Sequence, residues 1–294
     1  MRLPKPEQEP EHESCLFAAK RAGAIVTAMF DSILLNLAAL AALIPAALLP
    51  LRRDGGRDGL FWGLLALAVA GPLAWAVVQV GGNWNASLSA DLWVGIAASL
   101  VMFAIVSAFD RHAWRLTPLL TPYVLVLGVL ASLFAGSPDR PLGEQAAPAW
   151  LETHIIVSVV TLGLFTLGAV AASASFLQSR ALKLKKPNRL TRMLPPVLDS
   201  ERLSERLLAL SELVLGLGLA TGMAIEYQVT GSLLKLTHKT LFSLVAFVLI
   251  GLLLIGRRVC GVRGQIAARV ILLAYLLVIV GYFGVKFVQQ VLLS

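Results

Sequence analysis

Two histidines near the start of apolar segments are the residues best placed for chemistry in this chain. His154 lies in the stretch AWLETHIIVSVVTLGLFTLG, and His238 lies in KLTHKTLFSLVAF. Each is expected in or next to the first turn of a membrane helix, and both of those helices run inward from the same membrane surface. Two neutral imidazoles at similar depth could supply both axial ligands of a haem iron, each held by a hydrogen bond on its other ring nitrogen.

Residues close to these histidines suit the same cofactor. Thr153 and Thr237 could hold the imidazoles, and the cations Lys235, Lys239 and Lys286 could pair with haem propionates. The competing interpretation is that each histidine is only an interfacial polar residue at a helix end. That interpretation is favoured for either histidine alone, whereas the matched pair makes the two interpretations about equal.

Other reactive groups point less clearly to a function. Glu212 is expected about one turn inside the membrane, where a charge is costly and often functional, although a structural role beside Arg206 or Ser211 is the favoured interpretation. Cys15 and Cys260 lie far apart and outside any CxxC spacing, so neither a disulfide framework nor a zinc site is expected. No nucleophile–base arrangement, phosphate loop or metalloprotease motif occurs, and we therefore expect that the protein is not an enzyme.

The elements that must position these residues are long apolar segments. The chain is 57% hydrophobic and only 14% charged, whereas soluble proteins carry about 25% charged residues. Eight stretches are long enough to cross a hydrocarbon core of about 30 Å: 25–49, 60–80, 93–109, 117–135, 152–178, 207–228, 239–256 and 268–290. Unpaired backbone amides cannot face lipid, and the runs are too continuous for barrel strands. The sequence therefore predicts an all-α polytopic membrane helix bundle of about eight transmembrane helices.

Two patterns indicate how these helices meet. One face of the segment 152–178 reads His154, Ser158, Thr161, Phe165 and Gly168, which is small and partly polar and is therefore expected to face the bundle interior. In the next segment, Gly218 and Gly222 form a small-xxx-small pair that lets a neighbouring helix approach closely.

The distribution of charge predicts the orientation. The net charge is +8, and the basic residues gather in the loops after the first, third, fifth and seventh apolar stretches. By the positive-inside rule these loops face the cytoplasm and both termini are non-cytoplasmic, so the charge does not indicate a nucleic-acid partner. Trp84, Trp93 and Trp150 are expected near the outer boundary.

The polar parts of the chain divide as follows. Residues 1–24 are expected to form a flexible tail, and residues 25–294 the bundle, with a basic cytoplasmic loop at 179–206. Within this loop, apolar positions from Leu198 through Leu203 to Leu207 predict a short amphipathic helix on the inner membrane surface, where basic residues meet anionic headgroups. A determinant of topology is favoured over a regulatory lipid-binding role.

Three stretches of the sequence resemble a known family: LPPVLDSERLSERLLALSELVLGLGLATGM, HKTLFSLVAF and GVRGQIAARVILLAYLLVIVGYFGVKFV. They are similar to the cytochrome c assembly membrane-protein family, CcsA- and HemX-related, in its short YpjD-type branch. The resemblance covers a core at about 150–292, while the earlier helices agree in hydropathy and order alone. It implies a multi-pass protein of a bacterial inner membrane, with haem and other cytochrome-maturation or membrane-complex proteins as partners besides the membrane lipid.

The resemblance also implies a role for one residue, and the chain departs from the family pattern in one segment. Haem-handling members carry a haem-ligating outer histidine at the position of His154. They also carry a tryptophan-rich WWD segment in the following outer loop, where this chain reads EYQVTGSLLKLTHKT without tryptophan. His238 lies where those members carry the acidic end of that motif.

Together these observations predict a haem-binding accessory protein in which His154 and His238 ligate the iron of haem b, with Lys286 and Lys239 beside the cofactor. The alternative is a transporter, or an auxiliary or scaffold subunit of a membrane transport complex. That alternative would depend on Glu212 or Asn36 in a solvated cavity, and the lack of an inverted repeat disfavours a transporter.

Overall fold

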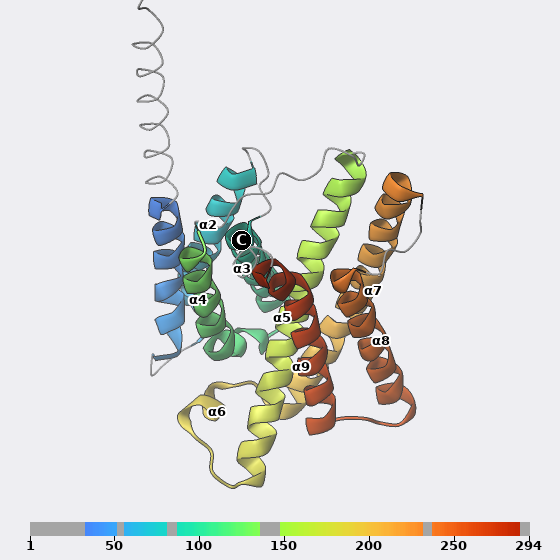
Figure 1. Cartoon of the computed structure of the whole chain (residues 1–294). Helices are drawn as coiled ribbons and strands as arrows, with labels where there is room; N and C mark the ends of the chain where they lie inside the picture. Colours follow the sequence, from blue (N-terminus) through green and yellow to red (C-terminus); the bar gives the residue numbers. More distant parts are fainter. Residues whose placement is uncertain (1–32, 52–55, 81–86, 136–147, 232–236, 289–294) are drawn as a thin grey trace, which may run out of the picture.

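The computed structural model describes residues 33–51, 56–80, 87–135, 148–231 and 237–288. Within these ranges every regular element is a helix (Figure 1). The apolar helix Ile33–Leu48 comes first. It is followed by η1 (Leu49–Leu51), α2 (Gly59–Val80), α3 (Leu88–Phe109), η2 (Ala113–Leu116), α4 (Thr117–Leu133), α5 (Pro148–Lys183), α6 (Arg189–Met193), α7 (Val197–Thr230), α8 (His238–Val259), α9 (Gln265–Ile279), a π-helical segment (Val280–Gly284) and α10 (Val285–Phe287).

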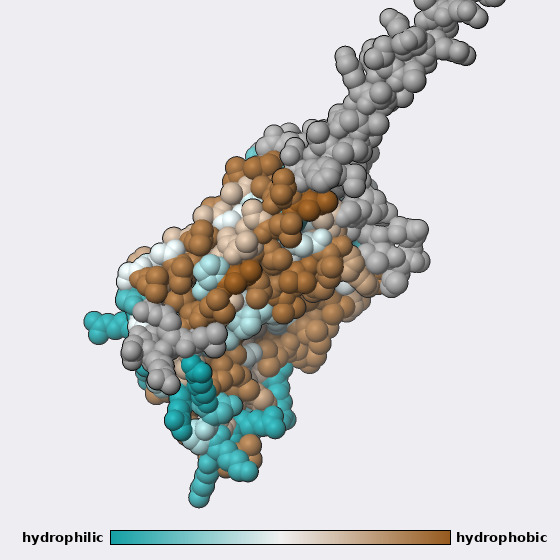
Figure 2. Space-filling view, turned by 90° about the vertical axis from the view of Figure 1, so that its left-hand side faces the viewer, coloured by the Kyte–Doolittle hydropathy of each residue, from teal (hydrophilic) through white to brown (hydrophobic). Residues whose placement is uncertain are grey.

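In the described part of the chain, seven helical stretches are long and apolar enough to cross a membrane. They match the second to the eighth predicted segments, which confirms the all-α membrane bundle. The first predicted segment, 25–49, corresponds to the helix Ile33–Leu48, and its beginning lies outside the described residues. Figure 2 shows the apolar surface over much of one face, with hydrophilic residues gathered at one end. We call the end that carries Arg115, Arg192 and Arg257 the basic end.

The helices form two groups that meet at α3 and α5. The helix α3 packs against α2 and α4, and α5 packs against α3, α7 and α9. The helix α8 in turn packs against α7 and α9. The helices α5, α7, α8 and α9 therefore form a ring in which α5 and α8 lie diagonally opposite each other.

One residue predicted to lie near the outer boundary is buried in the core. Trp93 is 0% exposed, and its indole Nε1 donates a hydrogen bond to Oδ1 of Asn36 at 2.6 Å. Its ring packs near Trp75, with 5.9 Å between the centroids. Trp93 lies near the start of α3, and its indole N–H finds its polar partner within the bundle rather than among headgroups, so its depth near the outer boundary stays a prediction.

The predicted surface helix is also different in the structure. The helix α7 runs unbroken from Val197 to Thr230, so residues 198–207 form its first turns and not a separate element. Ser200, Leu203, Ser204 and Leu207 are buried, and the hydroxyl of Ser204 donates to the carbonyl of Gly168 on α5 at 3.0 Å. Leu203 and Leu207 are thus buried in the bundle, whereas Leu198 in the first turn of α7 is exposed, and nothing after Pro196 interrupts the helix.

Candidate functional site

His154 lies in the second turn of α5, where this helix meets α7. The side chain is partly buried, and its imidazole lies against Gly222 of α7. A Cβ atom at Gly222 would lie only 3.2 Å from Cε1 of the imidazole. The glycine therefore provides the space that the ring occupies, and the predicted close approach of a helix at Gly218 and Gly222 is confirmed.

A short hydrogen-bond chain determines which nitrogen of His154 carries the proton. Nδ1 of His154 lies 3.0 Å from Oγ1 of Thr221, and the same hydroxyl donates to the carbonyl oxygen of Gly218 at 3.1 Å. A threonine hydroxyl has one hydrogen, and a carbonyl can only accept. Oγ1 must therefore accept from Nδ1–H, which leaves Nε2 with its lone pair, the form in which a neutral imidazole ligates a metal.

Below His154 the small and partly polar face of α5 turns into the bundle, as predicted. Phe165 is 1% exposed and Thr161 is 5% exposed. The hydroxyl of Ser158 donates to the carbonyl of His154 at 2.7 Å, and that of Thr161 donates to the carbonyl of Val157 at 2.8 Å. These hydroxyls are satisfied within α5, so the face can pack against its neighbours without unpaired groups.

His238 is the first residue of α8 and is exposed. Thr237, expected to hold its imidazole, instead caps the helix by accepting from the backbone N–H of Thr240 at 3.4 Å. Among the described residues no hydrogen bond or ring contact joins His238 to His154. Figure 1 shows α8 beginning below the upper ends of α5 and α7, on the far side of the ring from α5.

Of the three predicted cations, the structure describes the side chain of Lys286 alone. Lys286 forms an ion pair with Asp91 in the first turn of α3, and its Nζ lies 6.0 Å from the centroid of the Tyr282 ring. The side chain of Lys239 and the whole of Lys235 lie outside the described residues.

The two polar residues of the alternative function lie in different places. Asn36 accepts the hydrogen bond from Trp93 and is 4% exposed, which gives it a structural role in the core. Glu212 lies at the contact between α7 and α8, where its Oε1 would be 3.1 Å from a Cβ atom at Gly251. In the described part of the chain no hydrogen bond or ion pair is formed by this carboxylate.

A partly buried chain of hydroxyls joins α4, α9 and α5, and sequence reasoning missed it. Tyr123 and Tyr275 have their hydroxyl oxygens 2.6 Å apart, and that of Tyr275 lies 2.9 Å from Oγ1 of Thr166. Because Thr166 donates to the carbonyl of Leu162, Tyr275 donates to Thr166 and Tyr123 donates to Tyr275. The only sequence signal was the presence of tyrosines inside apolar segments.

Comparisons with known proteins identify relatives of this chain by sequence. The sequence model of a family described as "Cytochrome C assembly protein" matches residues 61–293. The match includes α2 to α4, where sequence analysis found agreement in hydropathy and order alone. The chain is also 51% identical over 271 residues to a protein of Azospirillum brasilense described as "Uncharacterized 28.8 kDa protein in nifR3-like 5'region", covering 90% of this chain and 100% of that protein. No solved structure matches the chain.

Proposed function

Because the chain belongs to the cytochrome c assembly protein family, we propose that it is a haem-binding accessory membrane protein, with a b-type haem held where α5 begins. The observation that carries this proposal is the hydrogen-bond chain from His154 through Thr221 to Gly218. It leaves Nε2 of His154 unprotonated and holds the ring by its other nitrogen, as a haem ligand requires.

The residues around His154 suit a porphyrin better than a bare metal ion. Within the described residues no group of three or more histidine, cysteine or acidic side chains could hold a metal. A haem brings four equatorial nitrogens of its own and supplies one-electron redox chemistry when bound. The protein then needs to provide only axial ligands and an apolar surround, and His154 of α5, held by Thr221 of α7, is the proposed first ligand.

The proposed second ligand is His238, which the ring of helices places across from α5 at the first turn of α8. Its side chain is exposed, so it is available to a ligand that enters between the helix ends. Lys239 is the proposed partner of a propionate. Lys286 is proposed for the same role, in which another donor of its ammonium group would bind a propionate beside Asp91.

The proposed role is accessory because the segment 226–240 contains no tryptophan. A chain without the WWD segment lacks the aromatic surface on which haem would be displayed to an apocytochrome. We therefore propose that this protein holds haem for, or supports, other proteins of cytochrome maturation and has no catalytic activity of its own. The proposed location is a bacterial inner membrane, with the basic end in the cytoplasm.

Optical spectra of the detergent-purified protein test this proposal. The oxidised and dithionite-reduced wild type is compared with His154→Ala and His238→Ala. The control is His112→Ala, because His112 lies at the basic end, 3.8 Å from Asp199, and no haem is proposed there. A Soret band with sharp reduced α and β bands is expected for wild type and control and is expected to be lost in both other variants.

A wild type that stays colourless after haem is supplied during expression would overturn the proposal. The second candidate is then an auxiliary subunit of a membrane transport complex, and the observation that favours it is the Glu212 carboxylate at the contact of α7 with α8. Recovery of a transport complex with the wild type but not with Glu212→Gln would support that function.

A further inference from the structure

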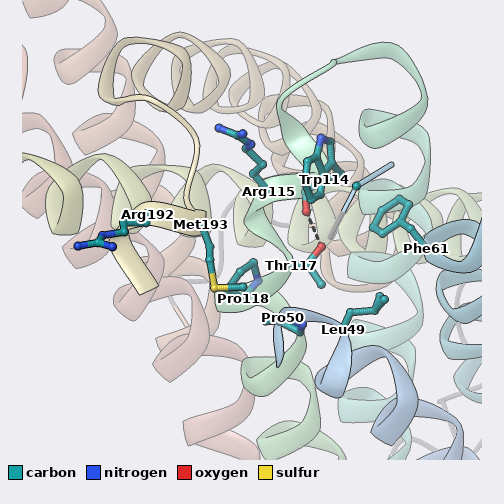
Figure 3. A pocket seen from close by; sticks show the side chains of 10 residues that line it. Leu49, Pro50, Phe61, Trp114, Arg115, Thr117, Pro118, Arg192 and Met193 are labelled. Carbon is teal, nitrogen blue, oxygen red and sulfur yellow. Dashed lines mark hydrogen bonds between the residues drawn. The ribbon is translucent and has the colours of Figure 1, made fainter. Parts of the chain in front are cut away.

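Two neighbouring hollows at the basic end share the same pair of arginines. One has a volume of about 200 Å³ and the other of about 350 Å³, and Arg115 and Arg192 line both. Figure 3 shows the first hollow, with Arg115 between Trp114 on one side and Arg192 with Met193 on the other. The arginines come from η2 and α6, which are separated in sequence by α4 and α5.

The hollows lie at the depth where the membrane-spanning helices end. The short helix η1 ends at Leu51, α2 begins at Gly59 and α4 begins at Thr117, whereas α5 continues to Lys183. The first hollow is lined by residues from the first three of these elements and from α6. The boundary of the apolar segments thus passes through it, and a ligand there would meet both acyl chains and water.

The lining of the first hollow combines apolar and cationic side chains. Leu49, Phe61 and Met193 form apolar walls, while Arg115 and Arg192 provide guanidinium groups. None of the described residues that line either hollow is acidic. Guanidinium groups bind phosphate oxygens by charge-assisted hydrogen bonds, so the charge of the lining fits an anion attached to an apolar body.

The segments that carry the two arginines are held in place by their own contacts. Nε2 of Gln178 on α5 lies within hydrogen-bonding distance of the carbonyl oxygens of Thr191, Leu194 and Pro195, at 3.0, 3.1 and 2.8 Å. A capping box between Asn188 and Thr191 fixes the start of α6. These contacts fix the backbone at Arg192, so a ligand has to order only its exposed side chain.

The guanidinium of Arg115 is held in a comparable way. Its Cζ atom lies 5.6 Å from the centroid of the Trp114 ring, a cation–π arrangement. The backbone of η2 is tied to α4 where the hydroxyl of Thr117 donates to the carbonyl of Trp114. Arg115 therefore stands at the hollow without a carboxylate partner among the lining residues.

We propose that this pair of hollows is a binding site for one anionic glycerophospholipid. Its phosphate contacts Arg115 and Arg192, and its glycerol and upper acyl carbons lie against Leu49, Phe61 and Met193. Membrane depth favours a lipid over a soluble phosphate, because the apolar walls would gain nothing from an inorganic ion. The inference is independent of haem, since the site lies at the opposite end of the bundle from His154.

Native mass spectrometry of the purified full chain tests the proposal. The wild type is titrated with phosphatidylglycerol and, separately, with phosphatidylcholine. The double variant Arg115→Gln/Arg192→Gln is compared with Arg202→Gln/Arg258→Gln, which loses the same charge at exposed positions of the same end outside both hollows. We expect the first phosphatidylglycerol to bind the wild type and the control equally and the hollow variant about ten-fold or more weakly.

Three results would overturn the proposal. The first is equal binding of phosphatidylcholine and phosphatidylglycerol to the wild type, which would show that the arginines do not select an anion. The second is an equal loss in the control variant, which would indicate general surface charge. The third is displacement of the lipid by millimolar inorganic phosphate, which would identify a soluble anion as the ligand. Should the double variant fail to fold, the single variants Arg115→Gln and Arg192→Gln carry the same comparison.

Discussion

Thr221 is the residue whose hydroxyl holds the imidazole of His154. Its hydroxyl accepts from Nδ1 of the imidazole and donates to the carbonyl of Gly218. Partners of this kind orient a ligating histidine and raise its basicity, and their loss typically costs 10–100-fold in affinity for the metal. The hydroxyl is thus expected to matter for haem although it would not touch the iron.

We predict that Thr221→Val weakens haem binding by about ten-fold or more. Valine keeps the shape of threonine but cannot accept from Nδ1, so the imidazole loses its fixed tautomer. Titration of the apoprotein with haem, followed by Soret absorbance, measures the dissociation constant. Thr221→Ser retains the hydroxyl and is expected to bind as the wild type does. Equal affinity in the valine and serine variants would contradict the role assigned to the hydroxyl.

For single residues, the sequence predicted the helix face on which a side chain lies better than its hydrogen-bond partner. The inward face of α5 could be predicted because helical periodicity places Ser158, Thr161 and Phe165 on one side of a single helix. The partner of His154 could not, because Thr221 lies on another helix and only the packing of α5 on α7 brings it close. Tyr123 and Tyr275 form their pair across α4 and α9 for the same reason.

At the scale of elements, the π-helical segment after α9 positions the start of α8. A Cβ atom at Gly281 would lie 2.7 Å from Cβ of Phe242, which stands one turn beyond His238. The two backbones approach so closely that no side chain fits between them. The π-helical segment therefore places the helix end that carries His238.

We predict that Gly281→Ala destabilises the protein by about 1–3 kcal/mol, because the added methyl group must push α8 away from the π-helical segment. Thermal unfolding of the protein in detergent micelles measures the change. The matched control is Gly284→Ala in the same segment, where the nearest atom to the new Cβ would be Cγ1 of Val280 at an ordinary 3.4 Å. An alanine at 281 that costs no more than one at 284 would contradict the close approach.

Helix existence was predictable from apolar length, but helix extent was not. The lipid-crossing parts of α5 and α7 were expected at 152–178 and 207–228, whereas the helices run over Pro148–Lys183 and Val197–Thr230. Hydropathy detects only the part of a helix that contacts lipid or core. The continuation of α7 depends on contacts such as that of Ser204 with Gly168, which lie outside the reach of a hydropathy pattern.

At the scale of the whole molecule, one ion pair ties the end of the chain to the first group of helices. Asp91 lies in the first turn of α3 and Lys286 in α10, with side chains 10% and 12% exposed. A ring contact between Phe134 and Phe287, with centroids 5.5 Å apart, supports the same junction. The ring of α5, α7, α8 and α9 is thereby joined to α3 and α4 at a point far from the basic end.

We predict that Lys286→Met lowers the free energy of unfolding by about 3–5 kcal/mol, because it removes the cation that faces the Asp91 carboxylate in a nearly buried place. The double variant Asp91→Leu/Lys286→Met is expected to recover most of that loss, since neither charge remains. Thermal unfolding of the wild type, both single variants and the double variant forms the cycle. A double variant as unstable as the sum of the single ones would contradict direct pairing.

The orientation of the whole bundle is open to a test with its own thiols. Cys260 is exposed at the basic end, in the turn between α8 and α9. In cells producing a Cys15→Ser variant, we predict that a membrane-impermeant maleimide labels Cys260 only after the inner membrane is opened. In a Cys260→Ser variant, Cys15 is expected to be labelled in intact spheroplasts. The reverse pattern would mean that the basic end faces outward, against the positive-inside rule.

The helix α5 is longer than a hydrocarbon core is thick, so part of it lies outside the lipid. Its 36 residues extend about 54 Å, while a hydrocarbon core is about 30 Å thick. At the basic end the last turns of α5 meet the segment before α7, where Gln178 bonds the carbonyl oxygens of Thr191, Leu194 and Pro195. Salt and proteases act on that part directly, whereas bilayer thickness acts on the rest of the same helix. A change in the aqueous solution or in the bilayer therefore acts on one continuous helix.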